Sequence, residues 1–302
     1  MSKQFIKKMK TTLYFRPKLL ISALVAISIL SACSSTKTTK SGTAPLSNTA
    51  VLEYRMPSAS GYSYNLIGSS EQFMEVQGQS IALSSNSLVG FTTANKKTEG
   101  GLIKFDVVID TAGMDATSMM ESFKTDLNLK GKQFTMSIQP TGKVVSYGQA
   151  ADISFSAGSA GETDLASLFS GMLPSFDKKE VTPGDIWAIS DTTELKSRTS
   201  QITTITTGTA TFIGFVTLNN RRCAQISNTI KGTRSGKMNS QGMDLLMTFP
   251  FTGTETIWFD SAYGVVVKYE SSAKGDGEIE VAGMGMTIPV SMTTTSVLEL
   301  IK

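Results

Sequence analysis

Alternation of apolar and polar side chains dominates the sequence from residue 51 onward. The clearest run spans residues 103–110, where Ile, Phe, Val and Ile alternate with Lys, Asp, Val and Asp, a pattern typical of a strand with one wet face. Similar runs, rich in Thr, Val, Ile and aromatic residues, recur up to residue 300 between short Gly-, Asn-, Ser- and Pro-containing breaks. Sequential short strands with tight connections favour antiparallel pairing. We therefore predict a mainly β fold, built as curved antiparallel sheets or as a half-barrel.

Two segments have helical rather than strand periodicity. Residues 165–173 follow Asp164, a residue type that caps helices, and end before Pro174. The apolar face of this segment consists of Leu165, Leu168, Phe169 and Met172. A second helix is expected at 116–127, although its Thr and Ser content gives it only modest helix propensity. The β fold should thus carry one or two short helices.

Two predicted hairpins resemble each other. Gly142–Tyr147 and Gly264–Tyr269 match in step, and each follows an apolar strand across a short turn. The match predicts two pseudo-repeat halves, residues 51–156 and 196–302, joined by a helix and a Pro-Gly-Asp turn within 157–195. Chance similarity between two hairpins is the alternative.

The first 32 residues have the composition of a secretory leader. They carry six basic residues and no acidic residue, and Leu19–Leu30 is an uncharged apolar run of 12 residues. A membrane-spanning helix needs about 20 residues, so this run fits a signal peptide better than a membrane span. The run leads into Leu30-Ser31-Ala32-Cys33.

The sequence Leu30–Cys33 resembles the lipobox of bacterial lipoproteins. The resemblance implies cleavage before Cys33, acylation of its thiol with fatty acids such as palmitate, and attachment to a membrane through these N-terminal acyl chains. Residues 33–50 are polar and small, and predict a flexible tether to a β-rich domain at 51–302. By analogy with lipoprotein sorting, Ser34 favours delivery to the outer membrane, facing the periplasm. An ordinary signal peptide, or a short anchor helix with a chance cysteine, is the alternative.

Composition excludes several kinds of chemistry. Once the leader is removed, acidic residues outnumber basic residues by three, so no general cationic surface is available for nucleic acid. The chain has no histidine, which excludes Ser-His-Asp catalysis and HExxH zinc sites. The fragment 232–237 is one residue short of a phosphate loop. We expect no catalytic residue, metal site or cofactor, and we expect Cys223 to be a small buried core residue.

A second resemblance lies between the two predicted halves. Leu173-Pro174 and the later Val181–Trp187, which reads Val-Thr-Pro-Gly-Asp-Ile-Trp, are similar to a motif of uncharacterised bacterial envelope lipoproteins of the DUF6263 type. The general layout resembles, more distantly, the half-barrels of LolA/LppX-like lipoprotein carriers. From the residues themselves we expect a tight turn at Pro183-Gly184 with Asp185 capping it through backbone N–H groups.

Methionine is unusually frequent. Thirteen of the 15 methionines follow Cys33, among them Met119, Met120, Met243, Met247, Met284, Met286 and Met292. Flexible, polarisable Met side chains can line a cavity for variable apolar ligands. Plain core packing and a Cu(I) site at Met284 and Met286 are alternatives.

Together these features predict a lipid-anchored envelope protein that is not an enzyme. We expect it to bind a lipid or other apolar ligand between helix and sheet, through Leu165, Leu168, Phe169 and Met172. The alternative is a structural or interaction lipoprotein with a filled core and an envelope protein partner.

Overall fold

The part of the chain from Leu46 to Lys302 forms one compact unit. The computed structural model describes residues 47–55, 61–76, 78–118, 122–156, 162–198, 200–240 and 243–302. The predicted leader, Cys33 and the greater part of the tether lie outside the described residues.

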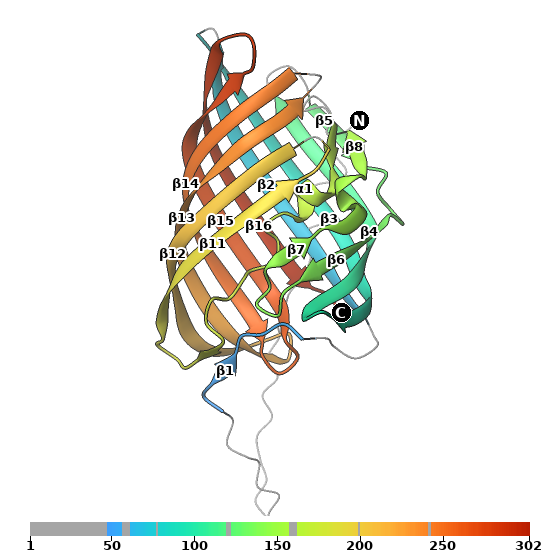
Figure 1. Cartoon of the computed structure of the whole chain (residues 1–302), viewed down its shortest axis with the longest axis vertical. Coiled ribbons are helices and arrows are strands. Elements are labelled where there is room, and N and C mark those ends of the chain that lie inside the picture. Colours follow the sequence, from blue (N-terminus) through green and yellow to red (C-terminus); the bar gives the residue numbers. More distant parts are fainter. Residues whose placement is uncertain are drawn as a thin grey trace, which may run out of the picture. The chain divides into compact units, whose positions relative to one another are not determined.

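Antiparallel strands make up most of this unit, which confirms the mainly β prediction (Figure 1). The main sheet has the order β11 (Ile186–Lys196), β12 (Ser200–Leu218), β13 (Arg221–Ser240), β14 (Met243–Asp260), β15 (Val265–Val281), β16 (Met286–Leu300), β2 (Tyr62–Val76), β3 (Gln79–Glu99), β4 (Leu102–Ser118), β6 (Gln133–Ile138) and β7 (Val144–Ser146), with β5 (Ser122–Asp126) also paired to β4. Two small pairs accompany it: β1 (Ala50–Val51) with β10 (Glu180–Val181), and β8 (Ser154–Ser156) with β9 (Glu162–Asp164).

Pairing of β16 with β2 makes one sheet from the strands of both predicted halves. Both matching hairpins are present, as β6–β7 and β14–β15. The division into pseudo-repeat halves stays a prediction.

The two expected helices have different outcomes. The first is confirmed as α1 (Leu165–Phe169), which ends four residues earlier than predicted; the only other helical element among the described residues is a short 3-10 turn, η2 (Gly148–Ala151). The second expected helix, at 116–127, is wrong, because β4 continues to Ser118 and β5 begins at Ser122. Small inward-facing residues such as Ala112 and Ala116 hide the strand alternation of β4 in the sequence.

Contacts between the two ends of the main sheet almost close it into a barrel. Lys143, beside β7, forms an ion pair with Asp191 on β11, with 2.9 Å between Nζ and Oδ1. The segment after α1 fills the rest of the gap: the Phe176 amide donates to Thr141 O at 2.8 Å, and Asp177 Oδ2 accepts from the Ser190 amide at 3.1 Å.

One end of this barrel-like sheet, which we call the filled end, is packed with apolar side chains. Tyr64, Phe91, Phe134, Phe259 and Leu298 are buried there in one core cluster. We call residues 165–176, α1 and the segment after it, the plug, because its apolar side chains belong to the same cluster. Each fully buried apolar side chain contributes roughly 1.5–3 kcal/mol to stability. The side chains of the filled end and the plug therefore account for much of the stability of the domain.

Two sequence motifs have structural roles. The turn at Pro183-Gly184 forms as predicted, with Gly184 at a φ of 93° and Asp185 Oδ2 accepting from the Thr182 amide at 3.0 Å. The fragment 232–237 lies in the middle of β13, so it cannot form the loop that cradles a phosphate.

Candidate functional site

The plug is positioned by a buried carboxylate at the start of α1. Asp164 is 1% exposed, and its Oδ1 accepts hydrogen bonds from the amide and the hydroxyl of Ser167 at 3.0 and 3.1 Å. Its Oδ2 accepts from Ser197 Oγ at 2.5 Å. Asp164 therefore caps α1, as predicted, and ties it to the connection between β11 and β12.

The four residues predicted to contact a ligand lie in the plug. Leu165 and Phe169 are fully buried, Met172 is 3% exposed, and Leu168 is partly buried against the same cluster. The Phe169 ring makes edge contacts with Phe91 and Phe134, at centroid distances of 5.1 and 5.0 Å. The helix thus packs among core side chains, and Met172 lines a small cavity.

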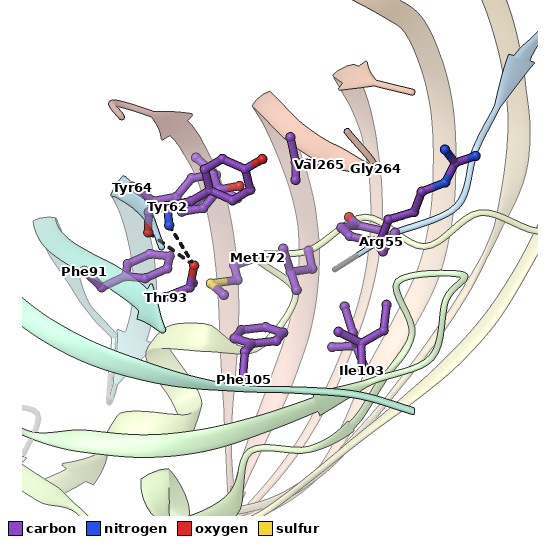
Figure 2. A pocket seen from close by; sticks show the side chains of 14 residues that line it. Arg55, Tyr62, Tyr64, Phe91, Thr93, Ile103, Phe105, Met172, Gly264 and Val265 are labelled. Carbon is purple, nitrogen blue, oxygen red and sulfur yellow. Dashed lines mark hydrogen bonds between the residues drawn. The ribbon is translucent and has the colours of Figure 1, made fainter. Parts of the chain in front are cut away.

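This cavity has a volume of about 60 Å³ (Figure 2). Its walls are apolar and aromatic, and include Tyr54, Tyr64, Phe91, Phe105, Met172 and Leu298. Ligand pockets usually measure about 300–1,000 Å³, so this space can admit one or two small groups but not a whole lipid.

The polar groups around the cavity are already engaged. Tyr54 Oη donates to Pro174 O at 2.9 Å, and Tyr64 Oη donates to Val266 O at 3.2 Å. Burial raises the pKa of both hydroxyls above the ordinary value, so neither serves as a base near neutral pH. Arg55 lies at the margin, and its guanidinium points away from the other labelled side chains (Figure 2). The cavity therefore offers apolar contact but no reactive group.

A second apolar surface lies on the inner face of the long strands, beyond the filled end. Because side chains alternate along each strand, the side chains of this surface lie on the same face as core residues such as Ile226, Ile257 and Tyr269. We call this surface the inner wall: Met74, Ile81, Leu83, Met238, Leu245, Met247, Ile279, Met286, Ile288 and Met292. All ten are partly exposed, and none belongs to the main core cluster or to the residues packed against it.

The opposite face of the same strands is mostly polar. On β15 it presents Lys268, Glu270, Lys274, Glu278 and Glu280 among other residues. Open hollows on this face, of about 590, 480 and 270 Å³, are lined largely by Thr, Ser and Lys side chains. The outer face is thus mostly polar, although it also carries exposed apolar side chains such as Ile67, Phe73 and Leu88.

Three charged side chains, one each on β11, β13 and β14, face inward. Asp191 is paired with Lys143, and Glu255 accepts hydrogen bonds from Tyr269 Oη at 2.7 Å and Asn228 Nδ2 at 2.8 Å. The third, Arg234, lies on β13 between two glycines. Unlike the two carboxylates, it has a single long hydrogen bond among the described residues, to Thr204.

Some of the methionines noted in the sequence lie on the inner wall. Met247, Met286 and Met292 are on the inner wall, whereas Met243 and Met284 are exposed, and Met119 and Met120 lie outside the described residues. Met284 lies in the turn before β16, so the two methionines of the copper alternative do not alternate on one strand. Arg234 and Met74 were not singled out as site residues, although the alternation along β13 and β2 would have placed both inward.

Comparison with known proteins leaves the family open. No family and no curated relative matches the chain. Among solved structures, an outer membrane channel from Pseudomonas putida F1 aligns over 83% of this chain and 98% of its own, at 8% identity and a TM-score of 0.26. A putative exported protein with a YmcC-like fold from Bacteroides fragilis NCTC 9343 aligns over 84% and 100%, at 9% identity and a TM-score of 0.22. A BenF-like porin from Pseudomonas fluorescens Pf-5 aligns over 80% and 99%, at 4% identity and 0.23. At these TM-scores the similarities carry no argument about function.

The described residues lack two kinds of feature. They contain no group of three or more Cys, Asp or Glu side chains placed to hold a metal ion. Nor do they contain a helix with the length and hydropathy needed to cross a membrane.

Proposed function

We propose that this chain is a lipid-anchored envelope protein, without catalytic activity, that binds an apolar ligand on its inner wall. Acylation at Cys33 would hold it at the outer membrane, and the polar tether would place the β domain in the periplasm. This placement rests on the lipobox resemblance of Leu30–Cys33.

The binding proposal rests on the exposure of the apolar side chains of the inner wall. Ten apolar side chains, five of them methionines, stay partly exposed on the inner face of a sheet whose outer face is mostly polar. Large contiguous apolar surfaces are rare on proteins without a partner or ligand for them. Methionine-rich walls also adapt to ligands of variable shape.

The ligand position differs from the one expected from the sequence. The filled end leaves only about 60 Å³ beside Met172. We therefore assign the ligand to the inner wall, with the plug as its floor.

The filled end favours the second candidate function, a structural or interaction protein. In that case the inner wall would be covered by a protein segment rather than by a small molecule. The two candidates differ in whether the purified chain alone binds a small apolar compound.

Native mass spectrometry of the full-length chain in a neutral maltoside detergent tests the proposal, with monolaurin as the probe. Ile288→Asp places a carboxylate on the inner wall and should lower the bound fraction about ten-fold, because ligand binding would desolvate it. Thr287→Asp places the same charge on the exposed outer face of β16 and should bind like the wild type. Absence of binding in the wild type, or equal binding by both variants, would overturn the proposal.

A further inference from the structure

Arg234 is a cation among apolar inward-facing groups. It lies on β13 on the same face as Ile226 and Ile230, and its registered neighbours on β12 and β14 are Thr204 and Phe249. Phe249 is 6% exposed. Desolvation by this surrounding protein lowers the pKa of Arg234, which nevertheless stays protonated.

The guanidinium has few partners. Nε donates to Thr204 Oγ1 at a long 3.4 Å, whereas an Arg side chain has five N–H donors. Within the described ranges no carboxylate lies at ion-pair distance from Arg234, in contrast to the partnered inward charges Asp191 and Glu255. A largely buried charge without a counter-ion lowers the stability of the folded protein.

Two glycines flank Arg234 on its own face of β13. A Cβ at Gly232 would lie 2.7 Å from Phe251 Cζ, and one at Gly236 would lie 2.8 Å from the Ile202 Cα. Both positions therefore have to be glycine, and the residues two before and two after Arg234 on its own face carry no side chain. The Phe251 ring lies over Gly232, so the approach to the guanidinium along the strand is from the Gly236 side.

Apolar side chains continue from this point along the inner wall. Gly236 pairs with Met247, and Met238 pairs with Leu245 on β14; Met247 then pairs with Ile279 on β15. An acidic head at Arg234 would thus have a methionine-rich surface beside it for its tail.

We propose that the inner wall is specific for an anionic single-chain amphiphile, whose carboxylate or phosphate pairs with Arg234 while its alkyl chain covers the neighbouring methionines. This inference rests on the proposed function and adds the class of ligand. Guanidinium groups bind both carboxylate and phosphate in bidentate geometry, so the acidic group is the shared feature.

The test uses three probes with the same 12-carbon tail: dodecanoate, dodecyl phosphate and neutral monolaurin. Native mass spectrometry of the full-length chain in maltoside detergent reports the bound fraction. Wild type should bind the anions about ten-fold more tightly than monolaurin. The anion with the larger bound fraction identifies the preferred head group. Arg234→Gln should lose this preference and keep its affinity for monolaurin, and Arg234→Lys should keep part of it.

Lys231→Gln is the matched control, because it removes one positive charge three residues away on the same strand, on the exposed outer face. It should behave like wild type. Loss of anion binding in Lys231→Gln with retention in Arg234→Gln would place the anion in the outer hollow that Lys231 lines and overturn the inference. Equal binding of all three probes by wild type would overturn the inference alone, whereas no binding of any probe would overturn the proposed function as well.

Discussion

Lys143 and Asp191 join the two ends of the long sheet through an ion pair of 2.9 Å. Asp191 also accepts a hydrogen bond from Ser175 Oγ at 3.2 Å, so the contact includes the segment that follows α1. Closure of the sheet and placement of the plug are therefore linked through one carboxylate.

We predict that this link is modest in energy. The two side chains are 43% and 23% exposed, and such pairs contribute about 1 kcal/mol or less. Lys143→Ala and Asp191→Ala should each lower the free energy of unfolding, with a coupling energy of about 0.5 kcal/mol in a double-mutant cycle measured by urea unfolding. Strictly additive losses would show that the pair does not join the ends of the sheet.

We predict that membrane anchoring depends on Cys33. Cys33→Ser should abolish both incorporation of radiolabelled palmitate and cleavage of the leader, because the acylated thiol is the substrate of the processing step implied by the lipobox. Cys223→Ser is the control and should be processed normally. Unchanged membrane fractionation and processing in Cys33→Ser would contradict lipid anchoring.

Phe169 should be the most sensitive residue of the plug. It is fully buried between Phe91 and Phe134, and truncation of such a residue costs about 3–5 kcal/mol. Phe169→Ala should lower the urea midpoint far more than Leu168→Ala, since Leu168 is only partly buried. Equal effects would mean that the helix does not pack through this ring.

Cys223 should be chemically inert in the folded protein. Burial, with a smaller effect of the Asp260 carboxylate, raises the pKa of its thiol to about 11. N-ethylmaleimide at pH 7.5 should therefore modify Cys223 only after unfolding. Rapid modification of the native protein, followed by mass spectrometry, would contradict this burial.

The same shift has a consequence for stability at high pH. Because folding raises the thiol pKa from about 9 to about 11, Cys223 contributes to the free energy of unfolding below pH 9. That contribution should decline as the pH rises from 9 to 11. Comparison with Cys223→Ser isolates it from other alkaline effects.

Much of the fold follows from local sequence signals. Alternation predicted strands, Asp164 predicted the start of α1, and Pro183-Gly184-Asp185 predicted its turn. The segment 116–127 was misread because strand β4 presents small residues inward there, so its period of two is weak. The length of the strands and the near-closure of the sheet depend on long-range pairing, which no local pattern reports.

The candidate site was only partly predictable for the same reason. The methionine content pointed to an adaptable apolar surface, but the sequence could not separate methionines of the inner wall, such as Met247, from exposed ones, such as Met284. Arg234 looked like part of a failed phosphate loop. Its inward orientation follows from the alternation along β13 once that strand is known to continue past Ile230.

The most direct test of the account is the mass of the protein as extracted from its own envelope. Native mass spectrometry should detect one additional non-covalent molecule on the wild type and on Thr287→Asp, and should find it absent from Ile288→Asp. Fragmentation of the released molecule should identify an acidic single-chain amphiphile. A wild-type chain that carries no such molecule, or an Ile288→Asp chain that carries it undiminished, would contradict ligand binding on the inner wall.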